Sequence, residues 1–359
     1  MTDTPTVPSG AARPDSVRQV VVREPGVVTI EVAPAPVPAA GEALVRLVAV
    51  GICGSDVHAA HGRHPFVPLP YHPGHEILGV VVDFGPDVAA DVAADVPVGA
   101  RVVIEPIHAC GACKYCLDGR YNLCATMRFF GCGTPVGGMS DLFVIKADRL
   151  VPIPDELADL QAVLIEPLST PVHAVSLAGP DLRGRSVAIL GAGTIGLLTL
   201  AAARRAGAER IAVTDVLPGK RELARRLGAD AVFDSADPTV VAQVREFLGT
   251  SADVVFDCVA VQTTVDQAIG MALKGGTVVI VGVPAAPVIV PLPEVQDLQV
   301  RIQGSATFTR ADFTTSIEML TSGAVRHEDI VTARYPLGEA PAAFDEASSG
   351  RQVKVVLLP

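Results

Sequence analysis

The chain has 359 residues and a formal net charge of −11, with 49% hydrophobic and 19% charged residues. This length is enough for two domains with sizeable cores. The acidic balance, the absence of a dense basic run and an aromatic content of 4% without tryptophan argue against nucleic acid and membrane surfaces as partners.

The N-terminal residues predict a flexible tail over 1–18. The first fifteen are rich in proline, threonine and serine, and they lack the apolar segment of a signal peptide. Seven cysteines without an export signal indicate a reducing compartment, the cytoplasm. In such a compartment, closely spaced cysteines indicate metal binding or catalysis before disulfides.

The next part of the chain predicts a compact, mostly β unit. Residues 17–32 read as two short strands around a Pro-Gly pair, and residues 42–50 read as a strand of alternating leucine, valine and alanine. Further short strands, broken by glycine and proline, follow up to about residue 150.

A scattered set of metal-ligand residue types lies in and just after this unit. Cys53 stands in Gly-Ile-Cys-Gly-Ser-Asp-Val-His, His75 and Glu76 in Pro-Gly-His-Glu, and Glu166 in Ile-Glu-Pro-Leu-Ser. A thiolate, an imidazole and carboxylates together leave room for an exchangeable ligand, as a catalytic zinc needs. Taken singly, each has a structural explanation as a core cysteine, a turn histidine or a helix-capping glutamate.

Four cysteines form a second, closely spaced group. Cys110, Cys113, Cys116 and Cys124 follow the pattern C-x2-C-x2-C-x7-C. Four thiolates packed so closely wrap a tetrahedral ion with no open position. The pattern predicts a closed structural zinc site; an iron–sulfur cluster and a set of reduced surface thiols are the alternatives.

From about residue 162, apolar strands and helical stretches alternate, which predicts an α/β unit with a doubly wound parallel sheet. The final segment, 308–359, ends in Lys-Val-Val-Leu-Leu, a candidate strand that rejoins the first unit. We expect strands at 187–190, 211–214, 231–233, 254–257, 277–281 and near 300–303, and helices at 195–206, 220–227, 240–248 and 264–273.

A glycine-rich turn opens this α/β unit. Gly191, Gly193 and Gly196 follow a strand at G-x-G-x-x-G spacing, and Asp215 ends the next strand. These glycines permit a tight turn, close approach of a pyrophosphate and close packing of the following helix. An acid at Asp215 accepts ribose hydroxyls and repels a 2′-phosphate, so the pattern predicts NAD. A membrane span over 187–203 is disfavoured because the run is short and begins with three glycines.

The order of these five motifs resembles the zinc-dependent medium-chain dehydrogenase/reductase superfamily, and the Glu-Pro-Leu-Ser segment is most similar to its sorbitol (polyol) dehydrogenase branch. The resemblance runs from about residue 20 to the C-terminus. It implies a GroES-like β catalytic domain at 19–163 that carries both zinc sites and is completed by 305–359. It also implies a Rossmann NAD-binding domain at 164–304, with the cleft between the two.

The resemblance implies roles for individual residues. Cys53, His75 and Glu76 would be ligands of a catalytic zinc, and Glu166 would lie at that zinc directly or through a water. Ser55 would accept the proton of a substrate hydroxyl and His58 would pass it to solvent. One NAD and two zinc ions would bind per chain, with hydride passing between a secondary alcohol and the nicotinamide. The implied cofactor contacts are Gly191, Gly193, Thr194, Ile195, Gly196, Asp215, Lys220, Val281, Gly282 and Val283.

The sequence departs from the polyol branch where substrate would be held. Ala59 stands where a tyrosine follows the relay histidine, and Thr307 and Phe308 stand where an arginine–tyrosine pair grips the polyol hydroxyls. We therefore expect a wider, less polar pocket that takes a cyclic or partly apolar secondary alcohol, or its ketone, at least as well as a linear polyol. The expected lining is Phe66, Phe129, Phe130 and Phe308.

Two alternatives belong to other classes. A zinc-free quinone or enone reductase of the same fold is disfavoured by Cys53, His75 and the four-cysteine group. A non-catalytic zinc- and nucleotide-binding redox sensor is disfavoured by Ser55 and His58 in relay register. Apart from its small-molecule substrate, the partner expected by analogy is a second copy of the chain, as a homodimer or homotetramer.

Overall fold

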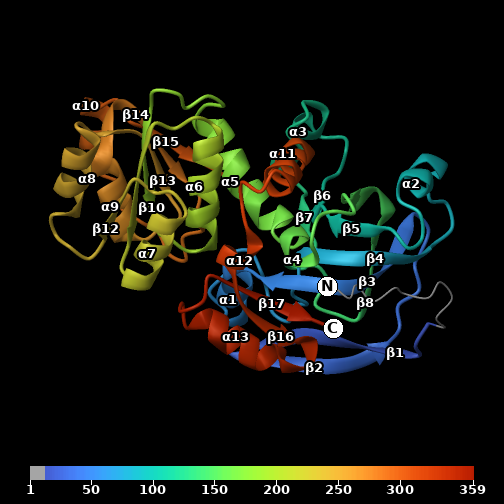
Figure 1. The fold of residues 1–359 in the computed structure, drawn as a ribbon. Helices are drawn as coiled ribbons and strands as arrows, with labels where there is room; N and C mark the ends of the chain where they lie inside the picture. Colours follow the sequence, from blue (N-terminus) through green and yellow to red (C-terminus); the bar gives the residue numbers. More distant parts are fainter. Residues whose placement is uncertain (1–12) are drawn as a thin grey trace.

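The computed structural model describes residues 13–359, and in it two units stand side by side (Figure 1). One unit, here called the parallel unit, holds a six-stranded parallel sheet formed by residues 186–304. The other, the β unit, holds a seven-stranded sheet and a two-stranded hairpin. No helix among the described residues is long and apolar enough to cross a membrane.

The parallel unit has strand order β12-β11-β10-β13-β14-β15, so the order reverses between β10 and β13. Residues 187–190 of the central strand are fully buried, as expected for a parallel strand covered on both faces. Ligands bind at such a switch point, beyond the carboxyl ends of the strands. The elements are β10 (Ser186–Leu190), α6 (Thr194–Arg205), β11 (Arg210–Asp215), α7 (Pro218–Arg226), β12 (Ala231–Asp234), α8 (Val240–Leu248), β13 (Ala252–Asp257), α9 (Gln262–Met271), β14 (Ala272–Ile280), α10 (Leu292–Asp297) and β15 (Arg301–Gly304).

The β unit is built around one long strand, β3 (Glu42–Ile52). It pairs with β4 (Glu76–Phe84), β8 (Leu142–Lys146) and the C-terminal strand β17 (Lys354–Leu358). Figure 1 shows these red C-terminal strands beside the blue N-terminal ones. The remaining elements are β1 (Ser16–Glu24), β2 (Val27–Pro34), α1 (Gly54–Ala60), α2 (Ala90–Asp95), β5 (Arg101–Ile104), β6 (Ile107–His108), α3 (Lys114–Leu117), η1 (Tyr121–Leu123), β7 (Arg128–Phe129), η2 (Ala147–Arg149), β9 (Leu150–Pro152), α12 (His327–Ile330), β16 (Val331–Pro336), η3 (Leu337–Glu339) and α13 (Ala340–Ser348).

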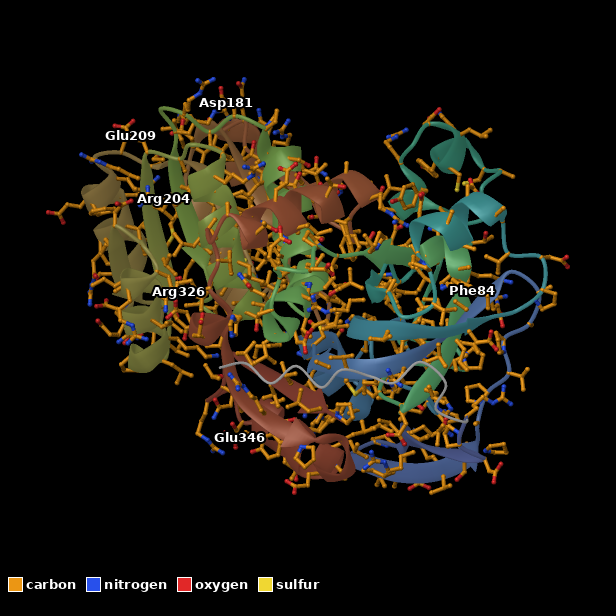
Figure 2. The ribbon with its side chains drawn as sticks, turned by 45° about the vertical axis from the view of Figure 1, so that its right-hand side comes forward. Phe84, Asp181, Arg204, Glu209, Arg326 and Glu346 are labelled. Atoms are coloured by element: carbon orange, nitrogen blue, oxygen red, sulfur yellow. The ribbon has the colours of Figure 1, made fainter. Side chains whose placement is uncertain are left out.

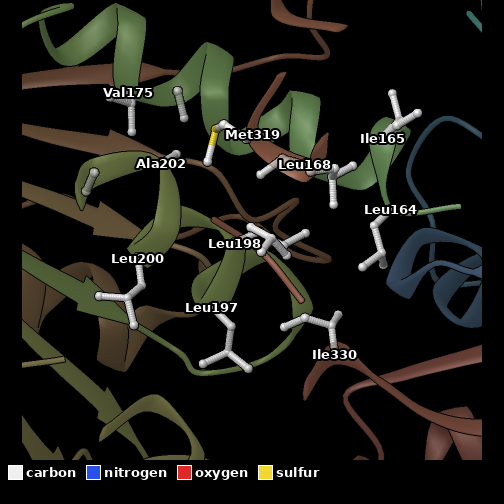
Figure 3. Packing of buried hydrophobic residues seen from close by; sticks show 14 of the residues in the cluster. Leu164, Ile165, Leu168, Val175, Leu197, Leu198, Leu200, Ala202, Met319 and Ile330 are labelled. Carbon is white, nitrogen blue, oxygen red and sulfur yellow. The ribbon is translucent and has the colours of Figure 1, made fainter. Parts of the chain in front are cut away.

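Three further helices join the units: α4 (Asp159–Ala162), α5 (Ile165–Ala178) and α11 (Arg310–Thr321). One hydrophobic core runs through the junction (Figure 3). In it Leu168 of α5, Leu198 of α6 and Met319 of α11 are all buried. Because α5 packs on both α6 and α11, its first turn is held at the boundary between the units.

Charged side chains lie on the outside of both units, as Figure 2 shows for Asp181, Glu209 and Arg326. Several form surface ion pairs, such as Arg205 with Glu318 at 2.8 Å. Such exposed pairs contribute about 0–1 kcal/mol each, so the buried core carries most of the stability.

Two expected boundaries are wrong. The predicted tail extends to residue 18, but β1 begins at Ser16, because Arg18 pairs with Asp141 through its backbone and guanidinium. The rest of that tail, residues 1–12, lies outside the described residues. The helix expected at 264–273 ends at Met271, and β14 begins at Ala272, where the chain pairs with Ala252.

Candidate active site and metal centres

Strand pairing brings the scattered ligand types together. Cys53 follows β3 and is the N-cap of α1, while His75 and Glu76 lie at the start of β4. In the antiparallel pair, Gly51 lies opposite Glu76. The thiol of Cys53, the imidazole of His75 and the carboxylate of Glu76 offer ligand atoms that all lie within 4.8 Å of one another.

A glycine is required at the centre of this cluster. A Cβ atom on Gly51 would lie 1.9 Å from Oε2 of Glu76, so a larger residue would displace the carboxylate. The Gly-Ile-Cys motif therefore provides both a ligand and the space for a second one.

A buried aspartate stands behind the histidine. Oδ2 of Asp56 accepts the backbone N–H of Cys53 at 3.0 Å, and Oδ1 lies 3.7 Å from Nδ1 of His75. Burial raises the pKa of Asp56 to about 6, against the opposing charge of His75. Burial is the largest single influence and lowers the pKa of His75, but Asp56, Cys53 and Glu166 together outweigh it, and the pKa is raised. The sequence predicted only a loop-orienting role for Asp56; the structure adds a buried carboxylate beside the imidazole of His75, with no hydrogen bond between the two.

The donor set fits a metal ion. Within residues 13–359, Oδ1 of Asp56 and Nδ1 of His75 are buried without a hydrogen-bond partner, so the cluster is polar and incompletely paired. A thiol, an imidazole and a carboxylate converge there, which is the ligand chemistry of a zinc site with an open position.

Lys354 is a member of this cluster that sequence reasoning missed. Its Nζ donates to Oε1 and Oε2 of Glu76 at 2.6 and 2.7 Å, and to the carbonyl of Ile52 at 3.2 Å. Burial is the largest single influence and lowers the pKa of Lys354, but Glu76, Cys53 and Glu166 together outweigh it, and the pKa is raised. The only sequence signal is a lysine at the head of an apolar strand.

Glu166 lies beside the cluster, in the first turn of α5, and is buried. Its carboxylate is not part of the group whose ligand atoms lie within 4.8 Å of one another. Burial raises the pKa of Glu166 to about 8, partly offset by the imidazole of His75. The sequence left open whether Glu166 binds metal directly or through water, and the structure places Glu166 outside the group of converging ligand atoms.

The two expected relay residues lie on α1, three positions apart. Ser55 is half-buried and His58 is exposed. Partial burial lowers the pKa of His58, as do the nearby charges of Arg63 and His61. Within residues 13–359 no hydrogen bond joins Ser55 to His58, so their relay role stays a prediction.

A cleft of about 310 Å³ runs between the two units. Cys53 and Val57 line it from the β unit, and the glycine loop lines it from the parallel unit. Its lining includes seven of the ten expected cofactor contacts: Gly191, Gly193, Thr194, Ile195, Gly196, Asp215 and Lys220. Cys258, Gln352 and Val353, which the sequence did not place there, also line it. Val281, Gly282 and Val283 do not.

The glycine loop is held by the acid at the end of β11. Oδ2 of Asp215 accepts the N–H of Ala192 at 2.8 Å, and Oδ1 accepts the N–H of Leu217 at 2.8 Å. Gly191 has a φ of 93°, a left-handed conformation that favours glycine. The acid therefore fixes the loop in addition to facing the cleft.

The four-cysteine group is also assembled. The sulfur atoms of Cys110, Cys113, Cys116 and Cys124 lie within 4.8 Å of one another. Cys110 donates its N–H to Sγ of Cys124 at 3.3 Å, and this bond with others from the backbone lowers the pKa of Cys124 to about 6. Such N–H···S bonds favour thiolates, and four thiolates close a tetrahedral site.

Replacing Cys116 by serine is expected to lower the free energy of unfolding by about 2–4 kcal/mol. The loop from Cys110 to Cys124 has little core of its own, so the bound metal would supply much of its stability. The soluble fraction should still bind NAD, because the cleft is elsewhere. Thermal unfolding, zinc content per chain and NAD titration measure this. Cys132→Ser, outside both groups, is the control. An unchanged melting temperature with unchanged zinc content would contradict a structural role.

The structure does not support the expected substrate lining. Ala59, Phe130 and Phe308 are 0, 3 and 1% exposed, and none lines the cleft. Ala59 is on the buried face of α1, Phe130 packs on Phe143, and Phe308 packs on Phe313. Thr307 directs its hydroxyl to the carbonyl of Asn122.

Of the other two expected pocket residues, Phe66 is largely exposed and does not line the cleft. Phe129 packs edge-on against His75, with ring centroids 5.4 Å apart. Phe129 is therefore an expected pocket residue that does contact the ligand cluster.

Comparisons with known proteins agree with this geometry. The family description "Alcohol dehydrogenase GroES-like domain" matches residues 39–155, and "Zinc-binding dehydrogenase" matches residues 194–322. The chain is 34% identical to sorbitol dehydrogenase of Bos taurus over 355 residues, covering 97% of each protein. It is 33% identical to L-idonate 5-dehydrogenase of Vitis vinifera, covering 92% of each.

A solved structure from Sinorhizobium meliloti, described as a zinc-binding dehydrogenase bound to NADP, superposes with a TM-score of 0.87. It is 32% identical in sequence, and the match covers 96% of this chain and 99% of that one.

Proposed function

Because this chain belongs to the zinc-dependent medium-chain dehydrogenase/reductase superfamily, we propose that it transfers hydride between a secondary alcohol and NAD at a zinc held by Cys53, His75 and Glu76. One observation carries the proposal: a single cleft is lined by Cys53 of the ligand cluster and by the glycine loop. The metal ligands and the nucleotide loop thus face the same space. The fold is a GroES-like β unit joined to a Rossmann unit.

When bound, zinc stabilises the negative charge that develops on the alcohol oxygen, and NAD accepts the hydride. Ser55 would take the hydroxyl proton and His58, at the exposed end of α1, would release it to solvent. The N–H groups at the start of α6 would bind the pyrophosphate, and Ile195 would pack on the cofactor. Asp215 and Lys220 would hold the adenosine ribose.

The other metal and the assembly belong to the same proposal. The four cysteines from Cys110 to Cys124 would hold a second, structural zinc. We propose a homodimer or homotetramer in the cytoplasm, where the free thiols stay reduced. We also propose that the nicotinamide contacts Val281, Gly282 and Val283. In support, Gly282 lies next to Val259, which lines the cleft.

Preference for NAD over NADP by about tenfold or more in kcat/KM is expected, because a carboxylate repels a 2′-phosphate. Asp215 faces the cleft, and Arg221 is engaged by the carbonyls of Asp215 and Val216 and by Asp234. Lys220 is therefore the cation available to offset the repulsion, and Lys220→Met should widen the preference. Steady-state kinetics with both cofactors test this. A higher kcat/KM with NADP would contradict the assignment.

A substrate panel tests the function itself. We expect NAD reduction with secondary alcohols, with kcat/KM for sorbitol, xylitol and cyclic alcohols lying within about tenfold of one another. The polar groups that grip polyols in the related branch are absent at Ala59 and Thr307, so selectivity should be flat. The apolar filling expected from Phe308 is not in the cleft, which removes the basis for a strong preference for rings.

Two results would contradict parts of this proposal. Sorbitol ahead by more than tenfold would show that other residues grip its hydroxyls. Zinc in the protein without turnover of any alcohol or ketone would favour the redox sensor, whereas turnover of enones without zinc would favour the zinc-free reductase.

A further inference from the structure

Lys354 is a buried cation that the proposed chemistry does not use. It is 3% exposed, and its three ammonium protons are accounted for by two bonds to Glu76 and one to the carbonyl of Ile52. It has no proton left for substrate or cofactor. Whatever it does at this site, it does through Glu76.

Glu76 is shared between this lysine and the ligand cluster. Its carboxylate lies within 4.8 Å of the ligand atoms of Cys53 and His75, yet both of its oxygens accept from Lys354. A cation bonded to both oxygens withdraws negative charge from the ligand cluster, and so weakens attraction to a metal ion. A Cβ atom on Gly51 would collide with Oε2 of Glu76, so the glycine leaves the room that this carboxylate occupies.

The residue before Lys354 contacts the cofactor loop. The hydroxyl of Thr194, at the start of α6, donates to the carbonyl of Val353. Gln352, Val353 and Val355 line the cleft. Two consecutive residues therefore join the two sites: Val353 bonds to the glycine loop, and Lys354 bonds to the candidate metal ligand Glu76.

We propose that Lys354 is a positioning residue that holds Glu76 in competition with the catalytic metal, and that the Thr194–Val353 bond links this competition to occupancy of the cofactor site. The proposal rests on the proposed function. A bound pyrophosphate at the start of α6 shifts Thr194 or Val353, the adjacent Lys354 shifts with them, and the carboxylate of Glu76 moves relative to Cys53 and His75.

The test uses the full-length protein with Co²⁺ in place of the catalytic zinc, because the electronic spectrum of Co²⁺ reports its ligand geometry. Lys354→Met removes the cation, and Lys354→Arg keeps it as the matched control. We expect Lys354→Met to lower the dissociation constant of Co²⁺ by about tenfold in chelator competition, because the competing positive charge is gone, and to change the cofactor-free spectrum. Lys354→Arg should stay close to the unmodified protein in both measurements.

The link to the cofactor has its own pair of variants. Thr194→Ser keeps the hydroxyl and Thr194→Val removes it. At saturating NAD, the unmodified protein and Thr194→Ser should show a change in the Co²⁺ spectrum that Thr194→Val lacks. NAD saturation is confirmed separately by calorimetry, so that weak binding is not mistaken for lost coupling.

Three outcomes overturn the proposal. Weaker Co²⁺ binding in Lys354→Met would make the lysine a support for the ligand, and an unchanged affinity and spectrum would make it a bystander. A full NAD-induced spectral change in Thr194→Val would remove the coupling. If Lys354→Met fails to fold, Lys354→Gln takes its place. If the unmodified protein binds no Co²⁺ at the Cys53 cluster, the proposed function itself fails.

Discussion

Replacing Cys53 by alanine is expected to lower kcat/KM for alcohol oxidation by at least about a thousandfold, because a ligand that holds the catalytic metal is lost. The dissociation constant of NAD should change by less than about threefold, because the glycine loop, not the thiol, binds the pyrophosphate. Steady-state kinetics and calorimetric NAD titration measure the two effects separately.

The local backbone should survive this change. The carboxylate of Asp56 accepts the backbone N–H of Cys53, so the start of α1 keeps that bond in the alanine variant. The matched control is Cys132→Ala, a partly buried free thiol that lies near the cluster but is not one of its ligands. It should retain near-normal activity and metal content.

The catalytic zinc content of Cys53→Ala decides the interpretation. A loss of about one zinc per chain with lost turnover and intact NAD binding supports a zinc mechanism. Full alcohol oxidation by a protein without that zinc would refute it. Loss of NAD binding in the same variant would show instead that the two halves of the cleft are not independent.

Motifs that are local in the chain could be predicted from the sequence. The glycine loop and the four cysteines each lie within fifteen residues, so spacing alone predicts their geometry. The cluster of Cys53, His75 and Glu76 required a long-range fact, the antiparallel pairing of β3 with β4. The resemblance to a family predicted that these three residues share one metal site, which their spacing in the sequence does not show.

Lys354 could not be predicted, and the reason is topological. It lies 278 positions from Glu76, and the contact exists because β17 pairs with β3 beside β4. No local pattern reports that pairing. The sequence predicts a strand at the C-terminus, but not which buried carboxylate its first residue meets.

The expected lining residues Ala59, Phe130 and Phe308 are buried away from the cleft for a different reason. Alignment to a family assigns a residue to a position but not the side to which it points. Ala59 follows the exposed His58, yet it faces the core of the β unit, where α1 packs on α13. Burial of Phe308 against Phe313 likewise depends on how α11 is docked. The burial of Ala59 and Phe308 is decided by tertiary packing, which an alignment does not report.

Replacing either of two glycines of the cofactor loop by alanine should have different effects on folding stability. A Cβ on Gly196 would lie 1.8 Å from the carbonyl oxygen of Gly191, which is rigid backbone. We expect Gly196→Ala to lower the free energy of unfolding by about 3 kcal/mol or more, because the start of α6 must move away from β10. NAD binding should be lost with it.

Gly193 is the matched control from the same motif. A Cβ there meets no atom within 4 Å, and its φ of −76° suits any residue. Gly193→Ala should therefore change the free energy of unfolding by less than about 1 kcal/mol, the scale of a changed helix cap. Its Cβ would instead occupy the space that the pyrophosphate needs, so NAD affinity should fall by about tenfold or more.

Together, Gly196→Ala and Gly193→Ala separate the effect of the glycine loop on folding stability from its effect on NAD binding. Thermal unfolding in the absence of NAD should be altered in Gly196→Ala and nearly unaltered in Gly193→Ala, whereas calorimetry should show weakened NAD binding in both. If Gly193→Ala bound NAD with unchanged affinity, the pyrophosphate could not lie against this loop. The cleft between Cys53 and Gly193 would then have to hold its nucleotide in another orientation, and hydride transfer at the ligand cluster would lose its geometric basis.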